Sequence, residues 1–140
     1  MKHLSLTFFA TLALMALGGC RKECQCPKED PLPKTRTIEY RLYTKENFST
    51  DNHEITFNLY LRSNHGYGTK LFDSALTTML ISKIPDQAHQ LVFHKTVPAG
   101  FEADTLTAGF TYYIKDVGYS WFLDTIGPRT SSKIIDYSFR

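Results

Sequence analysis

Three cysteines lie close together near the N-terminus, and their spacing limits the thiol chemistry that is available. Cys20 directly follows an apolar run, whereas Cys24 and Cys26 lie in a stretch rich in proline and charge. Structural zinc takes four ligands at recognisable spacings, and a thioredoxin-like redox site takes C-x-x-C at the start of a helix. The C-x-C spacing matches neither, so we predict no metal site here. In an oxidising compartment Cys24 and Cys26 could form a strained local disulfide, pair between molecules or stay free.

The residues before Cys20 have the layout of a secretory signal. Lys2 and the amino terminus are positive, and the apolar run at residues 4–17 has about the 7 to 15 residues of such a signal, fewer than the roughly 20 that span a bilayer. A short membrane anchor or a buried N-terminal helix is the alternative. The run ends in glycines without stop-transfer charges, which favours the secretory signal.

The sequence Leu17-Gly18-Gly19-Cys20 resembles the lipobox of bacterial lipoprotein precursors. The resemblance implies that a type II signal peptidase cuts between Gly19 and Cys20, and that Cys20 carries a diacylglycerol on its sulfur and an acyl chain such as palmitate on its new amino group. Stable anchoring takes at least two lipid signals, which these chains supply. We therefore expect a lipid-anchored protein of the cell envelope, with no cofactor beyond the covalent lipid. Arg21, in place of an aspartate that favours inner-membrane retention, favours the outer membrane.

Cleavage before Cys20 divides the chain into three parts. Residues 1–19 are the expected signal peptide, residues 20–34 the lipid-anchored cysteine with a flexible tether, and residues 35–140 one folded domain. The tether has three prolines and one aliphatic residue, Leu32, so it buries too little apolar surface to fold. At about 3.1 Å per residue, such a linker reaches up to roughly 40 Å.

The charge balance excludes one class of partner. The chain has 16 Lys and Arg against 14 Asp and Glu, a net charge of +2. Nucleic-acid binding usually depends on a strongly basic surface, so we predict no nucleic-acid partner. The expected partners are the membrane, through the lipid, and an envelope protein or a glycan.

Side chains that could perform catalysis are scattered along the chain. The sequence has no G-x-S-x-G, H-E-x-x-H, Walker or G-x-G-x-x-G motif. His53 and His65 fall in polar loops, and His89 and His94 are five residues apart, on opposite faces of a continuous strand. We therefore predict a non-enzymatic protein with no catalytic residues. The remaining alternative is an envelope hydrolase, in which His53, His65 or His94 meets a carboxylate and a nucleophile.

Loop carboxylates offer a second possible site. Asp51 with Glu54, and Glu102 with Asp104, could supply oxygen ligands to calcium. Calcium takes six to eight oxygens, and neither loop has a dense series of Asp and Asn. We predict solvated acids and no metal.

After Lys34 the hydrophobic pattern takes a period of two, which is typical of strands with one buried face. The predicted strands are residues 37–44, 54–62, 90–97, 106–115, 119–126 and 133–139, with 71–81 as one bent strand or two. The residues predicted to face inward are Ile38, Tyr40 and Leu42; Ile55, Phe57, Leu59 and Leu61; Leu106, Ala108, Phe110, Tyr112 and Ile114; and Ile135, Tyr137 and Phe139.

About seven short strands without a helix or a repeat indicate an all-β domain. We predict a single antiparallel β-sandwich with immunoglobulin-like or other Greek-key topology. The domain has no Cys-Trp-Cys pattern, which excludes a disulfide-pinned immunoglobulin domain. With the lipobox, this layout resembles small single-sandwich lipoproteins of diderm envelopes.

Aromatic residues carry the binding hypothesis. Several gather in residues 112–122, around the turn at Gly118. Large aromatic side chains ordinarily build a sandwich core, so we predict that Trp121 packs there, although it stays a candidate ligand-binding residue. Tyr113 and Phe122 lie on the opposite parity from their inward neighbours and are predicted to be exposed. The lipobox, the tether and the absence of catalytic motifs lead us to predict an envelope binding or assembly module. The alternative, which depends on the aromatic residues, is a glycan-binding module that uses Tyr113, Phe122 and Trp121.

Overall fold

The computed structural model describes residues 31–140, so the expected signal peptide, the expected lipidation site Cys20, and Cys24 and Cys26 lie outside the described residues. The described part contains seven strands, two short 3₁₀ helices, Ile81–Lys83 and Gln87–His89, and no α-helix. The strands are β1 (Thr37–Thr44), β2 (Glu54–Ser63), β3 (Lys70–Leu80), β4 (Leu91–Thr96), β5 (Leu106–Ile114), β6 (Gly118–Ile126) and β7 (Ser132–Phe139). The predicted all-β class is confirmed.

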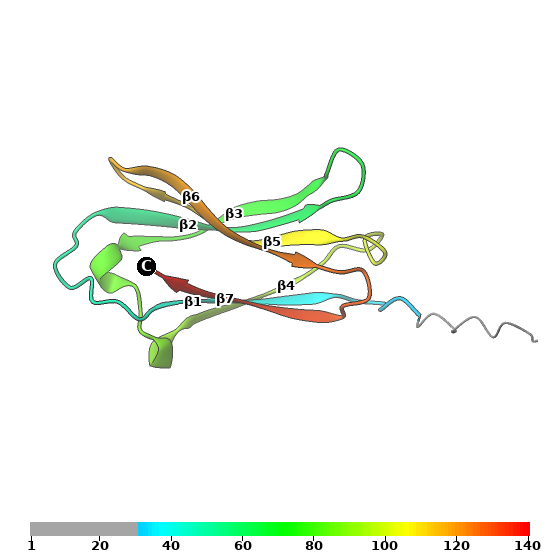
Figure 1. Ribbon diagram of the computed structural model, residues 1–140, viewed down its shortest axis with the longest axis horizontal. Coiled ribbons are helices and arrows are strands. Elements are labelled where there is room, and N and C mark those ends of the chain that lie inside the picture. The colour runs from blue at the N-terminus through cyan, green and yellow to red at the C-terminus, as the bar shows by residue number, and fades with distance from the viewer. Residues whose placement is uncertain (1–30) are drawn as a thin grey trace, which may run out of the picture.

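The strands form two sheets that pack face to face (Figure 1). The smaller sheet has the order β4-β1-β7, and the larger has the order β3-β2-β5-β6. All neighbouring pairs are antiparallel except β1 and β7, which run parallel. An immunoglobulin domain combines its first, second, fourth and fifth strands in one sheet. The predicted sandwich is therefore confirmed, and its division of strands differs from the immunoglobulin one.

The segment predicted as one bent strand or two is the single strand β3. Its pairing with β2 shifts register between Phe57 and Asn58 and again between Leu61 and Arg62. Such irregularities increase twist and bend an edge strand, which accounts for the mixed hydrophobic pattern of this segment.

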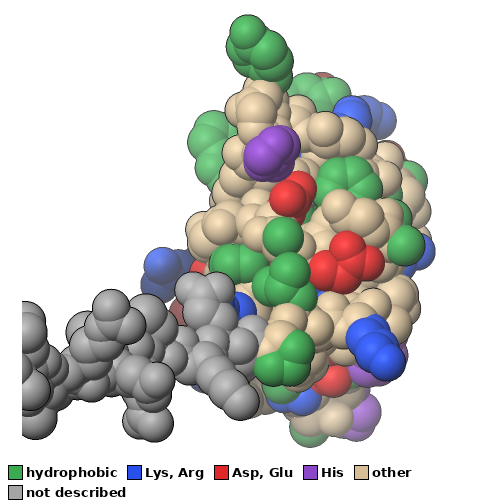
Figure 2. Space-filling view, turned by 90° about the vertical axis from the view of Figure 1, so that its right-hand side faces the viewer, with side chains coloured by type: hydrophobic (Ala, Val, Ile, Leu, Met, Phe, Trp, Pro, Cys, Tyr) green, Lys and Arg blue, Asp and Glu red, His purple; other side chains and the backbone are tan. Residues whose placement is uncertain are grey.

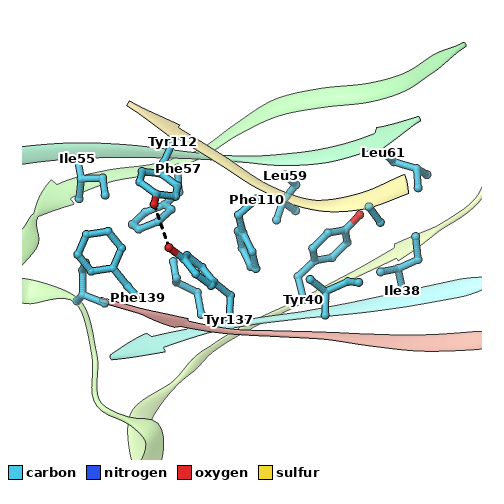
Figure 3. Packing of buried hydrophobic residues seen from close by; sticks show 14 of the residues in the cluster. Ile38, Tyr40, Ile55, Phe57, Leu59, Leu61, Phe110, Tyr112, Tyr137 and Phe139 are labelled. Atoms are coloured by element: carbon cyan, nitrogen blue, oxygen red, sulfur yellow. Dashed lines mark hydrogen bonds between the residues drawn. The ribbon is translucent and has the colours of Figure 1, made fainter. Parts of the chain in front are cut away.

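The core lies between the sheets and is built from alternate residues of each strand (Figure 3). The residues predicted to face inward are buried, except Ile114 at the end of β5, which is half-buried. The Tyr40 ring packs edge-on against Phe110 with centroids 5.7 Å apart, and Phe57 packs against Phe110 from the other side of the cluster at 6.4 Å. Edge-to-face packing is a favoured arrangement of aromatic rings, so these contacts stabilise the junction of the sheets.

Tyr137 of β7 connects the smaller sheet to the β5-β6 hairpin. Its hydroxyl donates a hydrogen bond of 3.1 Å to the Tyr112 hydroxyl, drawn as the dashed line in Figure 3. Its ring stacks on Phe122 of β6, with centroids 4.6 Å apart and planes at 15°. Burial raises the pKa of Tyr137, and the bond to Tyr112 raises it further. These contacts fix the inner side of β6 against the core.

A buried arginine closes the end of the sandwich at which β1 begins. Figure 2 looks onto this end, where hydrophobic, acidic and basic side chains are mixed on the surface. Arg36 is 2% exposed, and its guanidinium donates to the carbonyl oxygens of Phe101, Asp104, Ile126, Gly127 and Thr130. Because these carbonyls belong to the β4-β5 connection and to the end of β6 and its loop, Arg36 ties both to the start of β1.

Candidate functional site

Strand β6 presents aromatic side chains on the outer face of the larger sheet. Tyr119 is 79% exposed and Trp121 is 68% exposed. Tyr113, which lies opposite Tyr119 on β5, is 37% exposed, and Leu123 continues the row at 38%. We refer to Tyr113, Tyr119, Trp121 and Leu123 as the aromatic platform.

The prediction that Trp121 packs in the core is wrong, and so is the prediction that Phe122 is exposed. Phe122 lies opposite Phe110, whose side chain is fully buried, whereas Trp121 lies opposite the half-buried Thr111. Residues directly opposite each other in an antiparallel pair share a face of the sheet. The register with β5 therefore sends Phe122 inward and Trp121 outward. Tyr113 is exposed, as predicted.

Tyr119 and Leu123 are the platform residues that sequence reasoning missed, and Tyr119 is the aromatic one. Its ring centroid lies 4.7 Å from that of Tyr113, with the ring planes at 41°. The connection at residues 115–117 sets this pairing, with Asp116 in the left-handed region at φ 64°. The short turn could have predicted this pairing from the sequence, because Tyr113 and Tyr119 lie at equal distances from its middle residue, Asp116.

Gly109 of β5, which lies opposite Leu123, allows β6 to approach β5 closely at that end of the platform. A Cβ atom at this position would overlap the carbonyl oxygen of Phe122 and lie 2.9 Å from the Cα of Leu123. No side chain fits there, so only glycine permits the observed approach of the two backbones. The placement of the platform row on β6 depends on this contact.

The outer face beside the platform is polar, and the middle parts of β2 and β5 carry no charged residue there, whereas Asp73 of β3 lies opposite Tyr60, on the side of β2 away from the platform. Thr56 and Asn58 of β2 and Thr111 of β5 lie in these middle parts, each half-buried. The charged residues of β2, Glu54 and Arg62, lie near its two ends. The groups next to the rings are therefore hydroxyls and an amide, which both donate and accept hydrogen bonds.

Two of the histidines considered for catalysis form contacts within single turns. His53 Nδ1 lies 2.7 Å from Asp51 Oδ1, and His89 Nδ1 lies 2.8 Å from Asp86 Oδ1. In each pair the backbone N–H of the histidine also donates to that carboxylate oxygen, and these bonds lower the pKa of both aspartates. Among residues 31–140 neither imidazole hydrogen-bonds a hydroxyl, so neither pair is part of a nucleophile-base-acid arrangement.

The other two histidines lie elsewhere. His94 on β4 has its Nδ1 4.0 Å from Glu39 Oε2, and His65 lies in the turn after β2, at the opposite end of that strand from His53. The structure does not bring the histidines together. Within the described part of the chain, no group of three or more His, Cys, Asp or Glu side chains is placed to hold a metal ion.

The loop carboxylates considered for calcium accept hydrogen bonds from the protein itself. The carboxylate of Glu102 accepts from the backbone N–H of Gly100 at 3.0 Å, which lowers the pKa of Glu102. The carboxylate of Asp104 accepts from the Ser63 hydroxyl, and its backbone carbonyl accepts from Arg36. These bonds shape the loop beside Arg36.

A hollow of about 590 Å³ lies at the other end of the sandwich, between the β1-β2 loop and the 3₁₀ helices. Lys45, Glu46 and Asp86 are its charged lining residues, and Phe48 is its aromatic one. No platform residue lines this hollow, so the platform is a separate, open surface.

No family model and no curated protein matches the chain. The described residues include no helix with the length and hydropathy that a membrane crossing requires. Function is therefore inferred from the platform and the groups around it.

Proposed function

We propose that the protein is a non-enzymatic binding module, held in the cell envelope by a lipid on Cys20, and that the aromatic platform is its contact surface. The observation that carries the proposal is the exposure of Trp121, at 68%, beside the paired rings of Tyr113 and Tyr119.

Three exposed aromatic side chains gathered on two neighbouring strands, Tyr113 on β5 and Tyr119 and Trp121 on β6, are costly to leave in water. Contiguous apolar patches on a folded domain commonly mark binding sites, and Trp and Tyr supply a large share of binding energy in known interfaces. The Phe122 contact with Tyr137 fixes the inner side of the same strand, so the platform rings extend from a supported backbone. A pre-ordered surface loses little conformational entropy when it binds.

The anchor is supported by the sequence alone. The lipobox Leu17-Gly18-Gly19-Cys20 follows an apolar run with a positive start, and one thiol is in the position that accepts diacylglycerol. Anchoring at Cys20 would keep the platform in the envelope, within reach of components fixed there.

Metabolic labelling tests the anchor. Cells that express the full chain are grown with radioactive palmitate, and the protein is isolated and tested for label. We expect label in the native chain and in Cys24→Ala, the matched control, and its loss in Cys20→Ala. A native chain that carries no label, or a Cys20→Ala variant that keeps it, would contradict the anchor.

A further inference from the structure

We infer that the platform binds an uncharged polysaccharide, which lies lengthwise along β6 with its sugar rings over Tyr119 and Trp121. The inference rests on the proposed binding function and names the class of ligand.

The platform is long enough to contact several units of a polysaccharide. Side chains on one face of a strand recur every second residue, about 6.6 Å apart at ~3.3 Å per residue. Tyr119, Trp121 and Leu123 therefore form a row about 13 Å long, which exceeds one sugar ring. The row is open along its length, so it can contact internal units of a polymer and does not require a chain end.

The chemistry of the surface fits a polyhydroxylated ligand. The C–H face of a sugar is flat and apolar, and aromatic rings remove it from water by stacking. The edge of the sugar carries hydroxyls, which need hydrogen-bond partners. Thr111 of β5, the strand next to β6, supplies a hydroxyl on the same face of the sheet, and Asn58 of β2, one strand further away, supplies an amide. The Thr56 hydroxyl on β2 lies 2.9 Å from the Thr78 hydroxyl, so these two groups already pair with each other.

Charge selects against other ligands. β5 carries no charged residue, and those of β2 lie near its two ends, Glu54 and Arg62. The cations of this region are Lys115, in the turn after β5 and next to Asp116, and Arg62 and Lys70 near the ends of β2 and β3, where Lys70 pairs with Asp73. An anionic polymer would therefore meet no continuous row of cations along the platform, whereas an interfacial membrane surface usually has Lys or Arg all around its apolar residues. An uncharged chain needs neither.

Fluorescence of the full-length, detergent-solubilised protein tests the inference, because Trp121 is the single tryptophan of the chain. The probes are maltohexaose, cellohexaose and chitohexaose, with glucose and N-acetylglucosamine as monosaccharides and polygalacturonate as the anionic polymer. We expect a saturable change in Trp121 emission with at least one hexasaccharide, and binding about tenfold or more weaker with its monosaccharide and with polygalacturonate.

Two variants assign the binding to the platform. Tyr119→Ala keeps the tryptophan reporter and is expected to weaken hexasaccharide binding about tenfold, a typical loss for an aromatic contact. Tyr67→Ala is the matched control, because Tyr67 is 104% exposed in the turn between β2 and β3 and lies outside the platform. It is expected to bind as the native protein does.

The inference is overturned if no hexasaccharide changes the emission, if polygalacturonate binds as tightly, or if Tyr119→Ala and Tyr67→Ala behave alike. These failures are distinct from failure of the proposed function. If the protein is labelled by palmitate and Trp121 is protected from hydroxyl-radical oxidation in intact envelopes, yet no hexasaccharide binds, the protein is a binding module with a protein ligand. A chain that binds hexasaccharides without palmitate label keeps the ligand assignment and loses the anchor.

Discussion

Trp121 and Phe122 are neighbours in β6 and face opposite sides of the larger sheet. Trp121 is 68% exposed, whereas the Phe122 ring stacks on Tyr137 with centroids 4.6 Å apart. The inner ring holds the strand to the core, and the outer ring is left available to a ligand. This division of roles leads to stability and binding effects that can be separated by mutation.

Phe122→Ala should lower the free energy of unfolding by about 2–3 kcal/mol, because it removes a partly buried ring and leaves a cavity against Tyr137. Trp121→Ala should change it by less than about 0.5 kcal/mol, as expected for an exposed side chain. Urea denaturation followed by circular dichroism measures both. Equal losses in the two variants, or a larger loss for Trp121→Ala, would show that the assigned faces are reversed.

Gly109→Ala should destabilise the β5-β6 hairpin by about 2–3 kcal/mol, because the added methyl group overlaps the Phe122 carbonyl and the strands must separate. Gly127→Ala is the matched control, since its Cβ would meet only Thr130 Oγ1 at an ordinary 3.8 Å. Thermal unfolding of both variants tests this. A Gly109→Ala variant as stable as Gly127→Ala would mean that the close approach of the strands is not needed.

Arg36→Lys should cost about 3 kcal/mol of stability, because one ammonium group cannot reach all the loop carbonyls that the guanidinium fork satisfies, and buried carbonyls lose their donors. Arg41→Lys, at the ion pair with Glu39 on the surface of β1, should cost less than about 0.5 kcal/mol. Urea denaturation compares the two. Similar urea midpoints for Arg36→Lys and Arg41→Lys would show that the Arg36 hydrogen bonds do not hold the loops to β1.

Alkaline titration should unfold the domain. Burial raises the pKa of Tyr40 and Tyr137 above the ordinary value of 10.0. A group with a raised folded-state pKa stabilises the fold fully below the unfolded-state pKa, and this contribution is lost as the pH rises above about 10. Phenolate absorbance and circular dichroism are followed together during the titration. The tyrosines that ionise only when the domain unfolds form a late phase, and each of Tyr40→Phe and Tyr137→Phe should remove one tyrosine from it. Complete ionisation near pH 10 with an intact dichroism spectrum would refute the prediction.

The sequence predicted the sandwich well where one face of a strand is clearly apolar. In β2, Ile55, Phe57 and Leu59 alternate with polar residues, so the period-two pattern alone identifies the buried face. β6 carries large apolar residues on both faces, Trp121 on one and Phe122 on the other, and hydrophobicity does not distinguish them. Only the register with β5 distinguishes the inner face of β6 from the outer one, and that register depends on the turn between the two strands.

Strand order and the role of Arg36 also could not be predicted from the sequence. The parallel pairing of β1 with β7 joins the two ends of the domain, and periodicity contains no information on which strands become neighbours. In the sequence Arg36 is one more charged residue just after the expected polar tether, and nothing there predicts burial. It is buried because its partners are backbone carbonyls from loops distant in the chain.

Hydroxyl-radical footprinting of Trp121 tests the central claim most directly, because it compares the exposure of the platform in the purified protein and in intact envelopes. Tyr67, 104% exposed and outside the platform, is the internal control. We predict that Trp121 is oxidised readily in the purified protein and protected in the envelope, while Tyr67 is oxidised equally in both. Protection of Trp121 in the purified protein, or equal oxidation of Trp121 in the two settings, would contradict the claim that the platform is an exposed surface occupied by a ligand in the envelope.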